Sequence, residues 1–184
     1  QFNDEQSYIL EFTDLLFRIY RDEGIIESGG SPVEVVTPWA EDDLFDLQFA
    51  STADTMFVVH PSYKPQKITR TSHTAWTVGN YAPTADVFTS TDNYPSAVAF
   101  YESRVVFGGT NTDPQKLFFS IAGDIEDMTI GTNDTDAMVY TLASKEVSRI
   151  RWISSSPNFL VVGTFGDIFK VTGSDINSAI TPTD

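Results

Sequence analysis

The residue types that could carry chemistry are few, and none of them stands in a catalytic pattern. The chain has two histidines, His60 and His73, and no cysteine. His60 ends an apolar run and precedes a proline, which favours a structural histidine bonded to a loop carbonyl, whereas His73 lies in a polar, solvated stretch. No Gly-x-Ser-x-Gly segment places a hydrolase serine. Neither Gly29–Gly30 nor Gly108–Gly109 leads into the Lys-Ser/Thr of a phosphate loop. We therefore predict no catalytic and no cofactor-binding residue.

Two acidic clusters are the remaining candidates for ion binding. Oxygen ligands at alternate positions can bind calcium, but neither cluster has the glycine and the distal glutamate of a calcium loop. A glycosidase would need two carboxylates at a defined separation, and no pair can be chosen among 26 acidic residues. We interpret both clusters as solvated loops and predict no metal site. The clusters are Asp124, Glu126 and Asp127, and Asn133, Asp134 and Asp136.

The three tryptophans could stack on sugars, since aromatic faces serve carbohydrate binding. Trp152 has the same position in its predicted strand as Phe49 and Phe100, so we expect it in the core. Trp76 lies in the loosest stretch of the chain, a predicted connector over residues 73–85, and exposure is the alternative left open for it. Trp39 precedes a predicted helical turn over residues 38–44.

A repeat of about 50 residues organises the elements that would position these side chains. Each copy has three short apolar strands separated by polar turns, and the copies span residues 47–70, 97–119 and 150–171. The aromatic residue that closes the first strand recurs at positions 49, 100 and 152. An all-strand repeat of this length is typical of propeller blades, because each small sheet must stack on its neighbours to bury its apolar faces.

We therefore predict an all-β fold, a propeller-like stack of small antiparallel sheets that forms an incomplete β-propeller. A β-sandwich is the alternative, since it also combines short strands with turn signals. The chain, residues 1–184, is read as a single all-β region. A hairpin is expected over residues 7–20, and residues 142–149 could form a short helix. The blade-like units are approximately 1–36, 44–90, 94–142 and 147–184.

Length and charge narrow the function classes. Closed propellers typically have about four to eight blades, and the chain holds fewer than four repeats of about 50 residues, so we expect a fragment of a longer polypeptide. The formal net charge is −15, from 26 acidic and 11 basic residues without a basic run, which argues against a surface that grips duplex DNA. Solubility alone explains such a balance, and a wall along which DNA must slide is the functional alternative. No apolar run approaches the ~20 residues of a membrane span.

Several segments resemble, in order and spacing, the large tail proteins of bacteriophages and prophages. The resemblance extends over about residues 2–182 and contains no catalytic motif. The segments that carry it are Thr37–Asp54 (TPWAEDDLFDLQFASTAD), Val59–Pro61 with Pro65–Arg70, Ala99–Thr110 (AFYESRVVFGGT), and Ala143–Val147 with Ile150–Trp152.

The resemblance implies a structural component of the tail tube, the nozzle or hub, of a short-tailed phage. Such a protein would be a propeller-bearing subunit of a homo-oligomeric ring, commonly of six copies, around the conduit for genome ejection. Its implied partners are other tail proteins (the adaptor and the fibres or tip), and DNA passes transiently without specific binding. The implied location is the virion tail, assembled in the host cytoplasm, and no enzyme activity is implied.

Two functions of other classes stay open at this point. The first is a carbohydrate- or receptor-binding adhesin module of the β-propeller type, which exposed aromatic residues in one pocket would favour. The second is a glycan hydrolase, which needs two carboxylates facing each other across a cleft.

Overall fold

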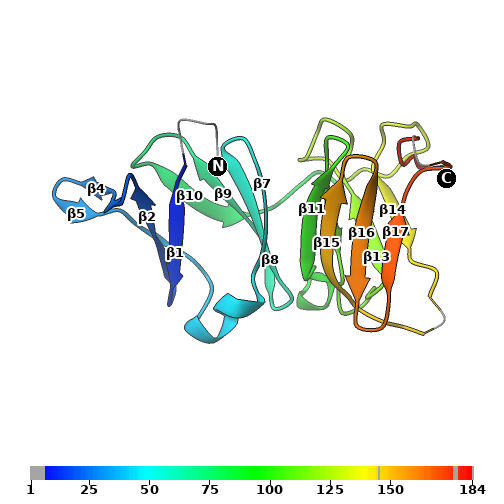
Figure 1. Cartoon of the computed structure of the whole chain (residues 1–184), viewed down its shortest axis with the longest axis horizontal. Helices are drawn as coiled ribbons and strands as arrows, with labels where there is room; N and C mark the ends of the chain where they lie inside the picture. The colour runs from blue at the N-terminus through cyan, green and yellow to red at the C-terminus, as the bar shows by residue number, and fades with distance from the viewer. Residues whose placement is uncertain (1–6, 145, 176–177, 184) are drawn as a thin grey trace.

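The computed structural model describes residues 7–144, 146–175 and 178–183. Its strands form four small antiparallel sheets that follow one another along the chain, together with a two-stranded hairpin, and within the described residues no sheet closes into a barrel. In Figure 1 the N-terminal sheets lie at the left and the C-terminal sheets at the right. The all-β prediction and the stack of small sheets are thereby confirmed.

The first two sheets occupy residues 9–36 and 48–80. The first sheet has the order β1-β2-β3, with β6 also paired to β2, and a small β4–β5 hairpin extends from it. The second sheet has the order β10-β9-β8-β7. Their strands are β1 (Ile9–Thr13), β2 (Leu16–Arg21), β3 (Gly24–Ile25), β4 (Glu27–Ser28), β5 (Ser31–Pro32), β6 (Glu34–Val36), β7 (Gln48–Thr52), β8 (Thr55–His60), β9 (Tyr63–Arg70) and β10 (Trp76–Asn80).

The last two sheets occupy residues 97–141 and 150–171. The third sheet has the order β11-β12-β13-β14 and the fourth has the order β15-β16-β17. Each is a meander, so neighbours in sequence are neighbours in the sheet. Their strands are β11 (Ala97–Tyr101), β12 (Arg104–Gly108), β13 (Lys116–Phe119), β14 (Met138–Thr141), β15 (Ile150–Ser156), β16 (Phe159–Thr164) and β17 (Ile168–Val171).

The middle of strand β8 is a continuous apolar run because both faces of the second sheet are covered. Phe57, Val58 and Val59 are consecutive in β8 and each is fully buried. Val58 packs toward the first sheet, whereas Phe57 and Val59 pack toward the third. A strand with one face in water would instead alternate apolar and polar residues. The second sheet is therefore an inner layer of the stack.

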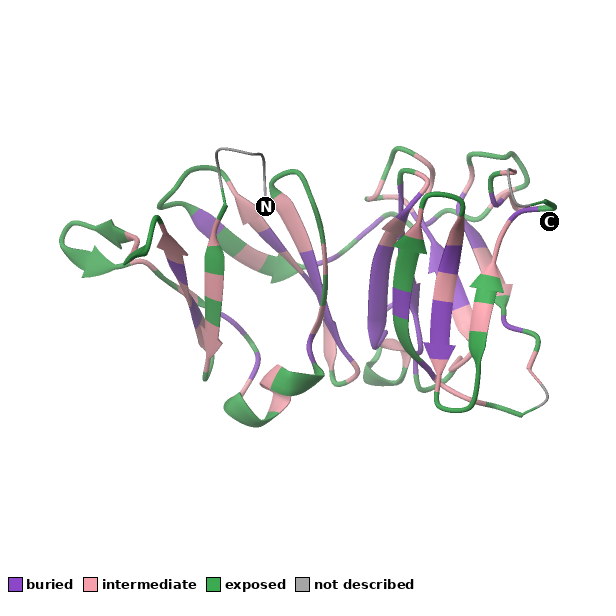
Figure 2. Ribbon diagram, viewed as in Figure 1, coloured by how far each residue is buried: buried purple, intermediate pink, exposed green. Residues whose placement is uncertain are grey.

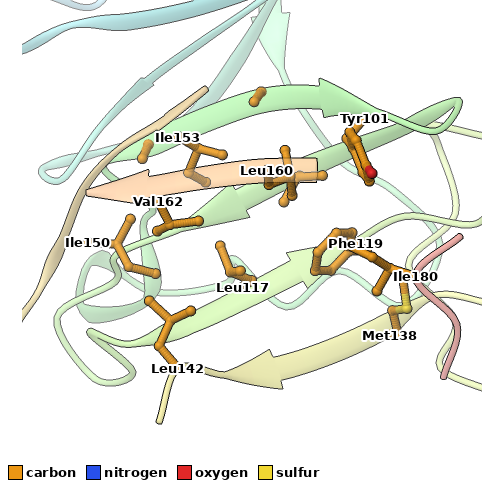
Figure 3. Close-up of a cluster of buried hydrophobic side chains, with 13 residues drawn as sticks. Tyr101, Leu117, Phe119, Met138, Leu142, Ile150, Ile153, Leu160, Val162 and Ile180 are labelled. Carbon is orange, nitrogen blue, oxygen red and sulfur yellow. The ribbon is translucent and has the colours of Figure 1, made fainter. Parts of the chain in front are cut away.

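Three apolar clusters join consecutive sheets. One lies between the first and second sheets, one between the second and third, and one between the third and fourth. Figure 3 shows the last cluster, in which Leu117 and Phe119 of β13 face Leu160 and Val162 of β16. The first strands of the last three sheets, β7, β11 and β15, also lie side by side. Sheets that fan out from adjacent first strands form the propeller-like stack.

The helical turn predicted over residues 38–44 is present but begins later, as a 3-10 helix, η1, over Glu41–Asp46, and a second 3-10 helix, η2, covers Thr91–Asn93. Other local expectations are wrong. The helix proposed for residues 142–149 is absent from 142–144 and 146–149, and residue 145 lies outside the described residues. The connector predicted for residues 73–85 contains strand β10. Trp76, for which exposure was left open, begins that strand and is buried between the first and second sheets.

The core position expected for Trp152 is also wrong, since its side chain is 38% exposed. The pairing of β15 with β16 shifts register between Ile150 and Trp152. Such a bulge adds one residue to the strand, and a shift of one residue turns a side chain to the opposite face. Ile153, rather than Trp152, consequently faces the third sheet, while the Trp152 ring lies over Gly163. Phe49, which has the same predicted phase, is 45% exposed.

Within the described part of the chain, no helix combines the length and the apolar character that a membrane crossing requires.

Candidate functional site

A groove lies where the first strands of three sheets converge. It has a volume of about 270 Å³ and each of the three strands contributes three consecutive residues. The convergence follows from the stack, because successive sheets bring their first strands together at the same edge. The lining residues are Phe49, Ala50 and Ser51 of β7, Val98, Ala99 and Phe100 of β11, and Ile153, Ser154 and Ser155 of β15. We call this hollow the axial groove.

The axial groove offers hydroxyls and apolar surface but no titratable group among its described lining residues. The Phe49 ring is the most open aromatic face there, with 45% of the residue exposed. Ser51, Ser154 and Ser155 supply hydrogen-bonding groups of ordinary alcohol character. General acid–base catalysis needs a group whose pKa lies near the operating pH, and these lining residues include none. The groove could therefore contact an uncharged ligand but could not transfer protons through its own side chains.

A smaller hollow of about 180 Å³ lies next to the axial groove and joins the second sheet to the fourth. The side-chain amide nitrogen of Gln48 donates a hydrogen bond of 3.1 Å to the Arg151 carbonyl. This contact links two residues that are 103 positions apart in the chain. It fixes the spacing between β7 and β15 at one end of the convergence. The residues that line this hollow are Phe45, Asp46, Gln48, Pro61, Ser96 and Arg151.

His60 is a structural histidine, although its partner differs from the one expected. The residue is 4% exposed, and its Nδ1 accepts a hydrogen bond of 3.1 Å from the Ser62 backbone amide rather than donating to a carbonyl. Burial lowers the pKa of His60, although the Asp43 carboxylate, 3.8 Å from Nε2, acts in the opposite direction. Burial disfavours the charged imidazolium, so the ring stays neutral and serves the β8–β9 turn.

His73 is exposed and takes part in a surface cluster. Its ring lies 5.9 Å from the Tyr8 ring, and the Tyr8 hydroxyl hydrogen-bonds to Nδ1. The Arg21 guanidinium lies 3.0 Å from Nε2. Besides the Tyr8 hydroxyl and the Arg21 guanidinium, the described contacts of the His73 ring include no carboxylate and no serine or threonine hydroxyl, so the cluster has the composition of a packing contact between the first and second sheets.

The acidic residues of the loop between β13 and β14 cap turns. The side-chain carboxylate of Asp124 accepts from the Glu126 amide at 3.0 Å, and that of Asp127 accepts from the Thr129 amide at 2.7 Å. Asp136 accepts from the backbone and side chain of Asn133, each at 2.9 Å. Side-chain oxygens used in this way stabilise turns in place of backbone partners. Among the described residues no cluster of potential metal ligands is present.

Arg104 holds the same loop against the third sheet, and sequence reasoning missed its role. It is 2% exposed, and its guanidinium donates to the carbonyls of Ser120, Asp134 and Asp136 at 2.6, 2.6 and 2.7 Å. Burial lowers the pKa of Arg104, with Glu102 and Asp136 acting in the opposite direction. An arginine inside a predicted blade strand, directly after a turn, is the signal that could have indicated a buried anchor.

The tryptophans do not form a sugar platform. Trp39 is fully buried, and the Trp76 indole nitrogen donates to the His73 carbonyl at 3.0 Å. Trp152 is partly exposed but does not line the axial groove. Phe49 and Phe100, rather than Trp76, for which exposure was left open, are the aromatic residues that line the axial groove.

No family model matches the chain, and no curated protein matches its sequence. We consequently infer function from the geometry above and from the resemblance of the chain's segments.

Proposed function

We propose that this chain is a structural part of the tail tube, the nozzle or hub, of a short-tailed phage. The main support for this proposal is the position of the resembling segments in the fold. Thr37–Asp54 leads through η1 into β7, Ala99–Thr110 takes in the end of β11 and all of β12, and Ile150–Trp152 opens β15, while Pro65–Arg70 lies in β9. The resembling segments thus include parts of the first strands of three successive sheets, the strands that line the axial groove.

The mechanism that we propose is mechanical, because stacked sheets make a rigid wall. Interiors joined by large aromatic side chains resist deformation, since close-packed cores have low compressibility. Between the second and third sheets, the Phe57 ring lies 5.0–5.8 Å from the rings of Tyr81, Phe100 and Phe107. Such a wall would hold a conduit open while other tail proteins, the adaptor and the fibres or tip, bind at its ends.

The charge distribution supports a wall that DNA passes without adhering. The chain has a net charge of −15, and most of its cations are already engaged. Among the described residues, six basic side chains lie within ion-pair distance of a carboxylate, and Arg104 and Arg149 donate to carbonyls. Phosphate binding requires Lys and Arg free to replace counterions. The ion-paired residues are Arg18, Arg21, Lys64, Lys67, Arg70 and Lys116.

Electron microscopy of phage particles tests the proposal directly. Particles would be prepared from a phage or induced prophage that encodes the chain, and antibodies raised against residues 1–184 would be applied with gold labelling. Gold at the tail end of intact particles is the expected result, with pre-immune serum as the control. Chain found only in the particle-free supernatant would overturn the assignment.

Duplex binding at low salt tests the electrostatic part separately. Non-specific DNA binders have Kd values of roughly 10⁻⁴ to 10⁻⁶ M at physiological salt and bind more tightly at low salt. Fluorescence anisotropy with a labelled duplex is expected to show no binding in this range, whereas a basic DNA-binding domain in the same buffer should bind. A micromolar Kd for this chain would contradict the proposal that DNA passes it without binding.

A carbohydrate-binding adhesin is the second candidate function, because of the residues that line the axial groove. Phe49 and Phe100 present aromatic surface beside three serine hydroxyls, a combination on which a sugar ring could stack. A glycan array probed with the chain and with Phe49→Ala decides between the two. Silence for both proteins favours the tail-wall function, and a signal that Phe49→Ala abolishes favours the adhesin.

A further inference from the structure

A short segment lies across one end of the contact between the third and fourth sheets without belonging to either sheet. It comprises residues 178–183, which come after β17, and none of them is part of a strand. Ile180 in this segment is 2% exposed and belongs to the apolar cluster that joins the two sheets. In Figure 3 Ile180 lies at the end of the cluster that holds Met138 and Phe119. We call residues 178–183 the strap.

Side chains of the third sheet bond to the backbone of the strap. The Ile180 amide donates a hydrogen bond of 3.0 Å to the carboxylate of Glu102, which lies in the turn between β11 and β12. The hydroxyl of Tyr140 in β14 donates to the Thr181 carbonyl. Consecutive residues of the strap thus present a backbone donor and a backbone acceptor, and the third sheet meets each of them with a side chain.

The strap is attached differently from the strands beside it. The strands of the third sheet are joined to one another by hydrogen-bonded ladders, and Figure 2 shows that β11 is mostly buried. Moving the strap away breaks no pairing between strands, because no strap residue lies in one. Local opening of a protein begins at segments of this kind, whereas strands of the core open at a higher free energy. The strap can therefore open while the sheets stay folded.

The groups that the strap covers suit one kind of segment. The apolar part of this socket is the end of the cluster at which Ile180 lies. Its polar parts are the Glu102 carboxylate, which accepts from a backbone amide, and the Tyr140 hydroxyl, which donates to the next carbonyl along the chain. Extended peptides are recognised by such a combination of main-chain hydrogen bonds and a side-chain pocket. The strap itself shows what fits: a branched aliphatic residue whose amide and following carbonyl can bond to the socket.

We propose that the strap is a releasable segment that occupies, within its own chain, a docking site for a partner protein. The partner inserts an extended segment with a branched aliphatic side chain in place of Ile180 and takes over the bonds with Glu102 and Tyr140. Strap and partner compete for one socket, so the apparent Kd of the partner is its intrinsic Kd divided by the fraction of chains whose strap is open. The proposal does not use the tail assignment, so either can fail while the other stands.

Hydrogen exchange of the 184-residue chain tests whether the strap opens on its own. The Ile180 amide should exchange at least about 100-fold faster than the slowest amides of β13 and β16, because a local opening needs less free energy than global unfolding. Low concentrations of urea should speed exchange in β13 and leave the Ile180 rate nearly unchanged, since a local opening exposes little surface. Equal exchange rates for Ile180 and β13 would overturn the proposal.

A fluorescein-labelled peptide with the sequence of the strap, SAITPT, tests the socket. Ile180→Asp should release the strap, because a carboxylate is costly in an apolar cluster, and fluorescence anisotropy should then show that this variant binds the peptide. The parent chain should bind the peptide at least about tenfold more weakly, because its own strap competes. Adding Tyr140→Phe to Ile180→Asp should weaken binding, since it removes the donor to the peptide carbonyl.

Matched controls and two contrary results complete the test. Ile130→Asp makes the same change at a residue that is 61% exposed, and it should behave like the parent chain in both assays. The peptide that carries the Ile180→Asp change should bind neither chain. An Ile180→Asp chain that has lost its circular dichroism would show that the strap is required for the fold and is not releasable, which would overturn the proposal. A folded Ile180→Asp chain that binds SAITPT no better than the parent chain does would also overturn it.

Discussion

Among the single residues of this chain, buried polar groups have the largest influence on local shape. Arg104 satisfies three carbonyls of the β13–β14 loop region from a site that is 2% exposed. His60 supports the β8–β9 turn by accepting from the Ser62 amide. Both groups illustrate that a buried polar atom is retained when its partners are fixed backbone groups, since an unpaired buried group is costly.

Replacing Arg104 with methionine should destabilise the chain by at least about 2 kcal/mol, because three buried carbonyls would lose their donor. Arg104→Lys should lose less, since it keeps the charge and part of the hydrogen bonding. Urea unfolding followed by circular dichroism measures both. Lys116→Met is the control: its ion pair with Asp113 is partly exposed to solvent, and solvent-accessible pairs contribute about 0–1 kcal/mol. Equal stabilities of Arg104→Met and the parent chain would contradict the anchoring role.

His60 predicts a component of the pH dependence. Because burial lowers its pKa in the folded chain, the unfolded chain binds a proton first as the pH falls below about 6.5. The contribution of the neutral His60 ring to the free energy of unfolding is therefore fully present above pH ~6.5. It decreases as the pH falls from there to the pKa of His60 in the folded chain, by no more than about 1.4 kcal/mol per pH unit. His60→Gln should lose less stability than the parent chain between about pH 7.5 and 5.5, on either side of that value. Parallel unfolding profiles over this interval would refute this role.

Among the secondary-structure elements, turns and bulges set which face a strand presents. The repeat of about 50 residues predicts where strands occur, because apolar β-branched and aromatic runs favour strands locally. The face of the sheet on which a side chain lies is harder to predict, because one inserted residue moves the following side chains to the opposite face. Trp152 demonstrates this: a register shift beside Ile150 turns it from the expected core to the face of the fourth sheet that points away from the third sheet. Strand β10 was missed because its residues, WTVGN, include a glycine and two polar residues.

Gly109 provides a prediction about how one strand ends. It follows β12 with a φ of +75°, and a Cβ there would lie 2.4 Å from the Ile150 carbonyl oxygen and 2.5 Å from Ser96 Oγ. Gly109→Ala should therefore cost more than the roughly 1–2 kcal/mol of a left-handed residue alone. Gly123→Ala is the matched control, since Gly123 has a φ of +80° with nothing within 4 Å of a Cβ. Thermal unfolding should give the lower Tm for Gly109→Ala, and the reverse order would contradict the close approach.

For the molecule as a whole, stability depends on contacts between consecutive sheets. Each sheet contacts mainly its neighbours, as in stacked repeat proteins, so a defect between two sheets should weaken the whole stack. The second and third sheets meet through an aromatic group that includes Phe57, Tyr81, Phe88 and Phe107. This central contact joins the two halves of the molecule seen in Figure 1.

Phe57→Ala should lower the free energy of unfolding by about 3–5 kcal/mol, because it removes a fully buried ring from this contact. Hydrogen exchange should report faster exchange in β8 and β12, on both sides of the contact. Phe45→Ala is the control: Phe45 is 99% exposed, and surface changes usually stay within about 0.5 kcal/mol. Exchange that accelerates in the second sheet alone would mean that the two sheets are not mechanically joined.

The all-β class and the strand-rich repeat could be predicted from the residues alone, because these features depend on local composition and spacing. Three other features required the packed chain: the strands that converge on the axial groove, the carbonyls that Arg104 binds, and the sheet faces that stay open. These features join residues far apart in the chain, as Gln48 and Arg151 do across 103 positions. The alternation of residues along a strand predicts on which side of the sheet a side chain lies. Whether another element covers that side depends on tertiary packing, which the local sequence does not determine.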